Sequence, residues 1–287
     1  YMELPFDPEY SLYNSRMTPE RLNHVTDDEQ YWAVRQKVIL RNTGELPIEI
    51  SGPDAEKFAN RLFARDVCGV KVGRCSYNFA LYHNGGIITD AIILRLADDK
   101  FWMVQADGEL FKWYIAHATN QDVKITDPNV WVSQVQGPKS MAVLKDVIDG
   151  DFPYPWRYFD IATVAIAGEE VIITRTGFSS ELGWEFYLRP TNNAEKVGNR
   201  IWEIGQKHGM ILTGTPVFRA RRIEAGLMSQ AEFDGTTTPF DAGLGHFLSM
   251  DQPYFIGKAA LEKADTRSRT FGMRVFGGIA ELRKSNF

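Results

Sequence analysis

The sequence predicts an α+β fold in which antiparallel sheets are covered by helices on one side. Three observations predict it. Apolar residues repeat at helical spacing in a few short segments, and β-rich runs between them are separated by turn signals such as Asn84-Gly85-Gly86. In addition, a β-rich run that ends in Gly-Pro and continues into a helical pattern occurs twice, at Gly52-Pro53 and at Gly137-Pro138.

The first half of the chain is expected to hold a helix followed by a three-stranded meander. Pro53 suits the first turn of a helix over 54–65, because the apolar residues of this segment share one helical face. They are Ala55, Phe58, Ala59, Leu62 and Phe63. Asn-Gly-Gly and Asp-Asp turns then separate strands expected at 77–82, 87–96 and 101–105.

The second half repeats this order, which hints at an internal duplication of a β-α-β unit. Residues 131–147 contain a β-rich run, Gly137-Pro138 and a helical pattern. Gly168 and a second Gly-containing loop separate the next three strands, which are expected at 163–167, 170–174 and 184–188. Two helices complete the pattern; they are expected at 194–208, where Gly209 ends the helix, and at 217–227.

Composition indicates a soluble enzyme and excludes several other classes. The chain has 287 residues, of which 44% are hydrophobic and 24% charged, so it is long enough to bury a large core and to hold about two domains. A net charge of -5 argues against a nucleic-acid partner. Cys68 and Cys75 lack the spacing of a zinc site or a disulfide framework, so we expect reduced thiols and no metal. Without an apolar run of about 18 residues or a leader pattern, we expect a cytoplasmic protein with no membrane partner.

Asp90 is the first candidate site residue. The alternation of a strand places Asp90 on the same face as Ile88, Ile92 and Leu94, so an ionisable group points where apolar side chains point. Burial of an unpaired carboxylate costs several kcal/mol or raises its pKa, and a partner, a metal or a ligand usually offsets this. The alternative is an aspartate at a strand end that caps backbone amides or pairs with an arginine.

The second candidate is the segment 175–185, which reads Arg-Thr-Gly-Phe-Ser-Ser-Glu-Leu-Gly-Trp-Glu. It places the carboxylate of Glu185 at the start of a strand, just past a loop that contains glycine. This placement predicts a bound ligand, although a glutamate on the exposed face of a strand is the simpler alternative.

The segment 85–90, which ends in Asp90, and the segment 175–185 resemble the two folate-binding signatures of the aminomethyltransferase (glycine cleavage T-protein) family. These signatures read G-G-x-x-D-D and R-T-G-Y-T-G-E-x-G-x-E. Further pieces match in the same order, at 50–55, 135–138, 222–226, 237–245 and 255–261. Details near the N-terminus resemble the tetrahydrofolate-dependent demethylase branch of the family, which is typified by dimethylsulfoniopropionate demethylase. These details lie at 13–19, 73–77, 101–102 and 106–107.

The resemblance implies two related α+β domains around a central folate cavity, followed by a small C-terminal β-barrel. The first domain is expected at 1–130, completed by part of 210–262, and the second at 131–209. Residues 263–287 are too few for the barrel, so we expect it to be shortened or missing, with only a remnant there.

The resemblance also assigns roles to residues. Glu185 would bind the amino and imino donors of the pterin ring of tetrahydrofolate, while Asp90 would orient the folate amine and stabilise the positive charge that develops on it. Arg175, Phe178 and Trp184 would complete the cofactor site. Tyr77, Tyr82 and His83 are the proton donors that we nominate, although aromatic and His side chains in strands are more often packing groups.

Departures from the family pattern narrow the expected function. Thr89 replaces the first acid of the paired motif, Phe178 replaces a Tyr, and Phe218 replaces the Arg of the A-R-D motif. We therefore expect a methyltransferase or demethylase that moves a one-carbon group from a small sulfonium, N-methyl or O-methyl donor to tetrahydrofolate, with a homodimer as a possible assembly. The alternatives are a glycine-cleavage aminomethyltransferase that uses a lipoyl carrier protein, and a non-enzymatic folate-binding factor for iron-sulfur assembly.

Overall fold

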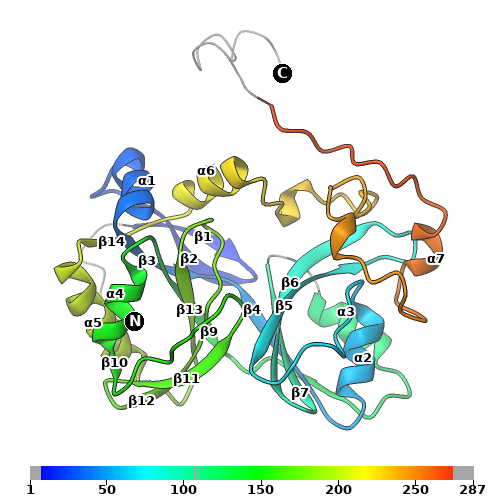
Figure 1. The fold of residues 1–287 in the computed structure, drawn as a ribbon, viewed down its shortest axis with the longest axis horizontal. Helices are drawn as coiled ribbons and strands as arrows, with labels where there is room; N and C mark the ends of the chain where they lie inside the picture. The colour runs from blue at the N-terminus through cyan, green and yellow to red at the C-terminus, as the bar shows by residue number, and fades with distance from the viewer. Residues whose placement is uncertain (1–7, 107, 109, 274–287) are drawn as a thin grey trace.

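The computed structural model describes residues 8–106, 108 and 110–273. The chain forms two lobes side by side, each built on one large sheet, as Figure 1 shows. Helices lie on the outer face of each sheet, and the inner faces of the two sheets are turned toward each other. The α+β class expected from the sequence is therefore confirmed.

The first lobe is built on a five-stranded sheet with the strand order β5-β6-β7-β4-β8. Its strands are β4 (Leu46–Ser51), β5 (Arg74–Leu81), β6 (Ile87–Ala97), β7 (Lys100–Gln105) and β8 (Lys124–Thr126). Helices α2 (Ala55–Leu62) and α3 (Leu110–His117) cover its outer face. The apolar stripe of α2 packs there against β-strand residues such as Ile93 and Met103, which are fully buried.

The second lobe is built on a seven-stranded sheet with the order β10-β11-β12-β13-β9-β3-β14. Its strands are β3 (Val38–Thr43), β9 (Trp131–Gln136), β10 (Ile148–Asp149), β11 (Ile161–Ile166), β12 (Glu169–Thr174), β13 (Gly183–Leu188) and β14 (Met210–Leu212). Helices α4 (Ser140–Val147) and α5 (Ala194–Lys207) pack on its outer face through apolar residues that include Val143, Leu144 and Ile201.

Apolar side chains join the inner faces of the two sheets. Leu94, Trp102 and Val104 of the first sheet form one buried cluster with Val132 and Tyr187 of the second. The layers therefore run helix, sheet, sheet, helix, and the contact between the sheets fixes how the lobes are oriented.

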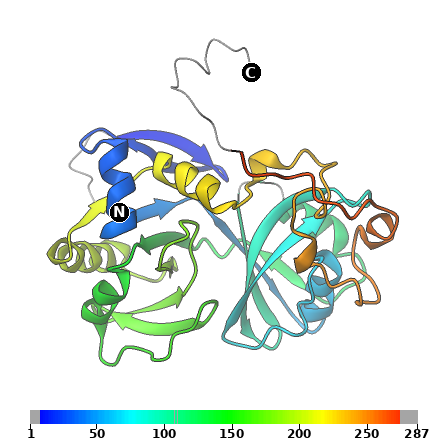
Figure 2. The ribbon, with the colours of Figure 1, turned by 45° about the horizontal axis from the view of Figure 1, so that its top comes forward.

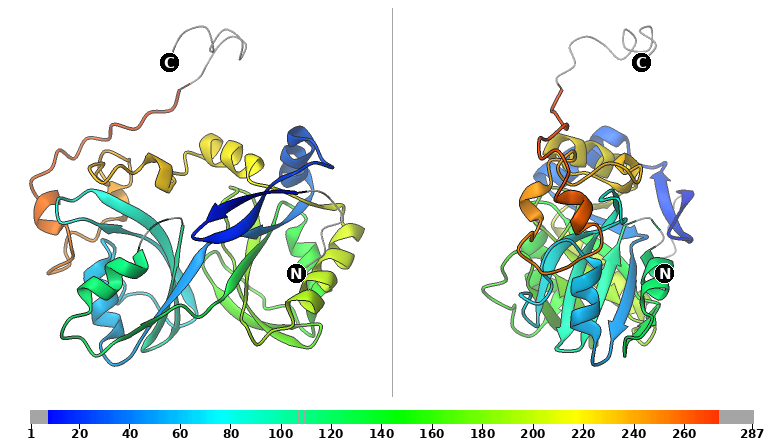
Figure 3. Two further views of the ribbon diagram at one scale, coloured as in Figure 1. Left: turned by 180° about the vertical axis from the view of Figure 1, so that it is seen from behind. Right: turned by 90° about the vertical axis from the view of Figure 1, so that its right-hand side faces the viewer.

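Segments from both ends of the chain cover the top of the two sheets. The hairpin of β1 (Pro8–Tyr13) and β2 (Arg16–Leu22) leads into α1 (Asp27–Gln36), which Thr26 and Glu29 start with a capping box. Helix α6 (Pro216–Ala225) lies beside α1, and the chain then crosses to the first lobe, as Figure 2 shows. This crossing contains η1 (Gln230–Glu232), η2 (Gly245–Phe247) and α7 (Lys258–Leu261). Figure 3 shows the β1–β2 hairpin on the opposite side of the molecule from this crossing.

The sheets differ from the sequence expectation in two respects. The expectation of antiparallel sheets was wrong for one pair, because β14 runs parallel to β3 after the α5 crossover. Strand β3 precedes residue 130 yet belongs to the sheet of 131–188, since it pairs with β9. The expected domain boundaries follow the order of the chain, whereas the pairing of the strands does not. These boundaries stay a prediction.

The expectation of a shortened or missing barrel also stays a prediction, and residues 274–287 lie outside the described part of the chain. Among the described residues, no helix combines the length and the apolar composition that crossing a membrane requires. Within the same residues, no three His, Cys, Asp or Glu side chains gather in a way that holds a metal ion.

Candidate functional site

A cavity of about 570 Å³ lies between the inner faces of the two sheets. Strands β5, β6 and β7 form one wall, and the segment 175–185 forms the opposite wall. The segment 226–229, Leu244 and Phe247 contribute from the crossing at the top. The charged residues that line it are Glu45, Asp90, Arg175, Glu181 and Glu185, and its aromatic residues are Tyr13, Tyr77, Tyr158, Phe159, Phe178 and Phe247.

Asp90 lines the cavity from β6 and is 8% exposed. The hydroxyl of Tyr77 on β5 donates a hydrogen bond of 3.0 Å to Oδ2 of Asp90. Burial raises the pKa of Asp90 to about 6, although this hydrogen bond acts in the opposite direction. The predicted alternation holds for Ile92 and Leu94, which lie on the inner face, but Ile88 packs with the outer cluster instead.

Glu185 lines the cavity from β13 and is 7% exposed. Its carboxylate accepts hydrogen bonds from the side chains of Gln134 (2.8 Å), Thr176 (2.6 Å) and Tyr187 (3.1 Å). Burial raises the pKa of Glu185 to about 7, the charge of Glu45 adds to this, and the bonds from Thr176 and Tyr187 oppose it. Asp90 and Glu185 are thus buried carboxylates that receive neutral donors, and no ion pair to either is found among the described residues.

The buried side chain of Gln136 holds the loop that begins the cavity wall. Its Nε2 donates to the carbonyl of Thr176 at 3.1 Å, and its Oε1 accepts from the hydroxyl of Ser179 at 2.6 Å. A Cβ atom on Gly177 or Gly183 would lie 2.2 Å from the Gln136 side chain, so only glycine allows this close approach. The glycines of the signature therefore have a structural role.

Two further contacts tie the loop to the helices at the top of the cavity. Glu181 pairs with Arg35 of α1 at 2.6 Å and with Arg221 of α6 at 3.1 Å. Phe178 lines the cavity and also packs against the cluster of α1 and α6. Arg175 also lines the cavity, and its guanidinium donates to the carbonyl of Trp156.

The structure does not bring Trp184 to the cavity. Successive residues of a strand face opposite ways, so Glu185 points inward while Trp184 is fully buried in the core beneath α4 and α5. There its ring lies 5.8 Å from that of Trp156. The role of Trp184 as a cofactor-binding residue was therefore wrong.

His83 and Tyr82 also lie outside the cavity. Both are exposed at the turn between β5 and β6, where the rings of His83 and Tyr82 lie near that of Trp113 on α3. The role of His83 as a catalytic proton donor is withdrawn. His83 lies in the turn past the end of β5, and its side chain is not on the face of the strand that lines the cavity. Of the nominated donors, Tyr77 reaches the site.

Sequence reasoning missed several cavity residues, among them Glu45, Tyr13, Tyr158 and Phe247. Glu45 lies in the short connection between β3 and β4, and no motif or periodicity points to it. Phe247 reaches the site because the crossing from α6 to α7 passes over β5, where its ring packs 5.1 Å from that of Tyr77. Only the tertiary fold brings these side chains to the cavity.

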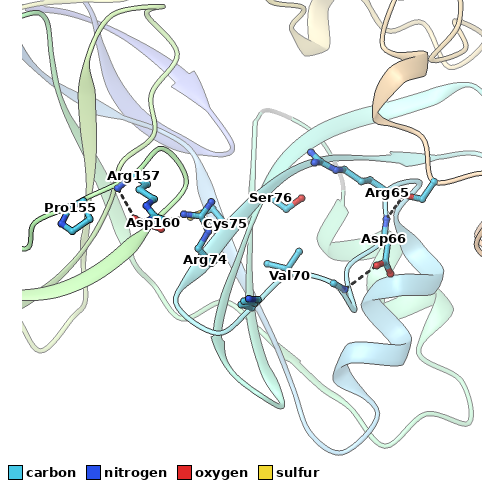
Figure 4. A pocket seen from close by; sticks show the side chains of 12 residues that line it. Arg65, Asp66, Val70, Arg74, Cys75, Ser76, Pro155, Arg157 and Asp160 are labelled. Atoms are coloured by element: carbon cyan, nitrogen blue, oxygen red, sulfur yellow. Dashed lines mark hydrogen bonds and ion pairs between the residues drawn. The ribbon is translucent and has the colours of Figure 1, made fainter.

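A second hollow lies beside the cavity and is an open groove, shown in Figure 4. Cys75 and Ser76 of β5 line the groove, whereas the next residue, Tyr77, lines the cavity. Beside them, Arg74 of β5 forms an ion pair with Asp160 of the second lobe. The groove has more cations than carboxylates, and its lining lacks the buried carboxylates that mark the cavity. Its charged residues are Arg65, Asp66, Lys71, Arg74, Arg157 and Asp160.

The raised pKa values predict a pH-dependent stability. A carboxyl group with a higher pKa in the folded than in the unfolded state binds more protons when folded, so it lowers the free energy of unfolding as pH rises from about 4 to about 7. The double variant Asp90→Asn/Glu185→Gln should lose this dependence. The free energy of unfolding of the variant minus that of the wild type should therefore be larger at pH 8 than at pH 4. The increase should be on the order of several kcal/mol.

Denaturant unfolding at several pH values measures this difference. Glu203→Gln, which changes an exposed glutamate on α5 outside the cavity, is the matched control and should not show the pH-dependent gain expected for the double variant. If the difference in free energy of unfolding between the double variant and the wild type did not change with pH either, the two carboxylates would titrate normally in the folded protein.

Comparison with known proteins shows which family and which solved structures the chain resembles. Residues 6–252 match the family model described as the GCVT N-terminal domain. The chain is 31% identical over 268 residues to an aminomethyltransferase of Caldanaerobacter subterraneus, covering 88% of this chain and 71% of the relative. It is 29% identical over 262 residues to dimethylsulfoniopropionate demethylase DmdA of Ruegeria pomeroyi, covering 88% of this chain and 69% of that protein.

A third relative is trimethylamine-oxide aldolase of Ruegeria pomeroyi, at 30% identity over 273 residues. This chain spans 34% of the length of that relative, and the match includes 89% of this chain. Among solved structures, aminomethyltransferase T of the glycine cleavage system from Bartonella henselae superposes with a TM-score of 0.79 at 22% identity, covering 89% of this chain and 70% of that one. This likeness concerns the fold.

Proposed function

The chain belongs to the family of the GCVT N-terminal domain, and from this premise we propose that it is a tetrahydrofolate-dependent methyltransferase. It would move a methyl group from a small methylated donor, with sulfur, nitrogen or oxygen at the methyl-bearing position, to tetrahydrofolate. The observation that carries the proposal is a cavity between the two sheets that is lined by a buried carboxylate from each of them, Asp90 and Glu185.

The cavity has the chemistry that a reduced folate needs. Members of the family use tetrahydrofolate, whose flat pterin ring carries amino and imino donors. Glu185 offers a carboxylate to these donors, and its own neutral partners hold it in place without neutralising its charge. Aromatic walls, including Phe178 and Tyr158, suit the faces of the ring.

The proposed roles of the chain's residues follow from these positions. When bound, tetrahydrofolate supplies the ring nitrogen that accepts the one-carbon group. Glu185 fixes the ring, Asp90 stabilises positive charge close to the accepting nitrogen, and Tyr77 orients Asp90 through its hydrogen bond. The buried site strengthens this stabilisation, because charges interact more strongly where water is excluded.

The residue at position 218 favours a methyl donor over an aminomethyl group on a lipoyl carrier. Phe218 replaces the arginine of the family's A-R-D motif and is buried, with the guanidinium of Arg41 lying 4.4 Å from its ring centroid. A packed aromatic ring thus occupies the position of a charged contact. The glycine-cleavage reaction remains the second candidate, because an aminomethyltransferase is among the similar relatives.

A donor panel tests the proposal. The protein is incubated with tetrahydrofolate and methylated sulfonium, betaine or methoxy-aromatic compounds, and mass spectrometry detects methyl-tetrahydrofolate. We expect methyl-tetrahydrofolate with one class of donor and its loss in the Asp90→Asn variant. Formation of methylene-tetrahydrofolate only with an aminomethylated lipoyl carrier would support the second candidate instead. Failure of the protein to bind tetrahydrofolate in calorimetry would overturn both.

A further inference from the structure

Gln134 connects the carboxylate of Glu185 with a cation outside the cavity lining. It lies on β9, between β13 and β3, and is 1% exposed. Its partners in the two strand pairs are Glu185 on β13 and Arg41 on β3. Residues directly opposite each other in antiparallel strands share one face of the sheet, with Cβ atoms about 5 Å apart. The side chains of Glu185, Gln134 and Arg41 therefore lie side by side on the inner face, and of these three Glu185 alone lines the cavity.

The amide of Gln134 has a defined orientation in this row. Its Nε2 donates to Oε1 of Glu185 at 2.8 Å. Its own Oε1 is shielded from solvent and accepts no hydrogen bond from the described residues. The reversed orientation would place the amide oxygen against a carboxylate oxygen, and two acceptors repel each other. The positive end of the amide dipole is thus held at Glu185, and the negative end is left for the neighbour on the other side.

That neighbour, Arg41, forms no ion pair within 4 Å among the described residues. Its Nη2 donates to the hydroxyl of Thr215 at 3.1 Å, whereas its Nε is shielded from solvent and has no hydrogen-bond partner in the same part of the chain. A guanidinium stays protonated at neutral pH, so its charge acts on nearby dipoles. A cation on β3 stabilises the orientation in which the amide oxygen of Gln134 points toward β3. This is also the orientation that gives Glu185 its donor.

The hydrogen bonds of Glu185 leave Oε1 as the atom for a ligand. Thr176 and Tyr187 both donate to Oε2, and these two bonds use both of its lone pairs. Oε1 accepts from Gln134 and keeps a second lone pair. A donor of a ligand can bond there while all three bonds from the protein persist. Gln134 thus holds the oxygen that a ligand would contact.

We propose that Gln134 and Arg41 are positioning residues of the proposed folate site: Arg41 orients the amide of Gln134, and this amide holds Oε1 of Glu185 toward the donors of the ring. The inference rests on the proposed function. Neither residue lines the cavity, so Arg41 acts on folate binding from two strands away, through Gln134. Removal of either residue should disfavour the charged form of Glu185 and leave its carboxylate free to turn.

Titration of Glu185 tests the coupling without a ligand. NMR of isotope-labelled glutamate carboxyls measures the pH midpoint, and Glu185→Gln assigns the signal. Burial raises the pKa of Glu185 to about 7 in the wild type. Gln134→Met removes the donor at nearly constant length and should raise this midpoint by about one pH unit or more; Arg41→Met should raise it by less. Because Arg41 acts through Gln134, adding Arg41→Met to Gln134→Met should cause no further rise.

Other charged and titratable groups lie near Glu185 and are kept in all of these variants. They are Glu45, Cys75, Asp90, Tyr158, Arg175 and Tyr187. Burial raises the pKa of the Cys75 thiol and of the Tyr158 and Tyr187 hydroxyls, so these three groups stay neutral through the midpoint of Glu185. Differences between the variants therefore report the row of Glu185, Gln134 and Arg41.

Tetrahydrofolate binding provides the second measurement. At pH 7, Gln134→Met should bind tetrahydrofolate about tenfold more weakly than wild type, because a smaller fraction of Glu185 is charged and the charged form is no longer held. At pH 9 the carboxylate is ionised in both proteins, and a loss of about threefold should remain from positioning alone. Calorimetry at the two pH values separates these contributions.

Two controls remove similar groups elsewhere. Arg219→Met removes an exposed cation of α6 whose charge acts on Arg41, and Gln252→Met removes a buried glutamine of the crossing. Both should leave the midpoint of Glu185 and the Kd for tetrahydrofolate unchanged. Gln134→Glu, a second variant of the same size, places a carboxylate beside Glu185 and should raise the apparent midpoint further.

The outcomes are distinguishable. The inference is overturned if the midpoint of Glu185 is the same in Gln134→Met and Gln134→Glu as in wild type. It is also overturned if Arg41→Met raises the midpoint equally with and without Gln134. Shifted midpoints in a protein whose wild type binds no tetrahydrofolate would reject the proposed function and leave the coupling between the three side chains in place.

Discussion

Replacing Glu185 with glutamine should weaken tetrahydrofolate binding by roughly 10- to 150-fold at pH 8, which corresponds to a loss of about 1.5 to 3 kcal/mol for hydrogen bonds to a charged group. Glutamine keeps the size of the side chain but removes the charge that the pterin donors would face. It also presents an amide group toward Thr176 and Tyr187, which both donate to the carboxylate. Calorimetric titration with tetrahydrofolate at pH 8 measures the effect.

The pH dependence of binding provides an independent check. Because burial raises the pKa of Glu185 to about 7, wild-type affinity should fall as pH decreases below 7 and the carboxylate becomes protonated. The glutamine variant should lack this step. Glu170→Gln, on the exposed side of β12, is the control that should bind as wild type does. Wild-type affinity in Glu185→Gln across this pH range would show that the pterin binds elsewhere.

Replacing Asp90 with asparagine should lower kcat about 10²- to 10³-fold while tetrahydrofolate binding is largely kept. The reason is that Asp90 would stabilise charge that develops only during transfer, whereas binding of the ring depends on Glu185. A loss confined to kcat identifies an interaction made in the transition state. Single-turnover kinetics with the donor identified by the panel, together with calorimetry for the folate, separate the two effects.

Tyr77 gives this prediction a graded test. Burial raises the pKa of Asp90 to about 6, so wild-type kcat should increase with pH through this value as the carboxylate ionises. The hydrogen bond from Tyr77 lowers the pKa of Asp90, and Tyr77→Phe should therefore move the profile to higher pH. Asp98→Asn, at the exposed turn after β6, should leave the profile unchanged. An unchanged kcat in Asp90→Asn would remove Asp90 from the reaction.

Local sequence patterns predicted the elements that carry the site. The expected helix at 194–208 appears as α5, and the strands expected at 87–96 and 184–188 appear as β6 and β13. These predictions succeeded because hydrophobic periodicity and turn residues act over a few neighbouring positions. The resemblance to the aminomethyltransferase family is confirmed by the family match over residues 6–252 and by the relatives.

The predicted site differs from the structure at residues whose side chains point away from the cavity, and at residues that only long-range contacts bring to it. Trp184 was assigned to the cofactor with Glu185, although adjacent strand residues face opposite ways. His83 was nominated as a proton donor, and it lies outside the cavity. Glu45 was not predicted at all, since only the packing of the two sheets brings it to the cavity.

By itself, the sequence determined the family of this protein, the type of most of its elements and the identity of two acidic residues on opposite halves of the chain. Only the tertiary structure decided that Asp90 and Glu185 line one cavity, that Trp184 belongs to the core, and that Glu45 lines the same cavity as the two acidic residues. The physical reason is that periodicity is a local property, whereas a cavity forms where two sheets pack through side chains distant in sequence, such as Leu94 and Tyr187. That packing depends on the shapes of many residues together, and no short motif encodes it.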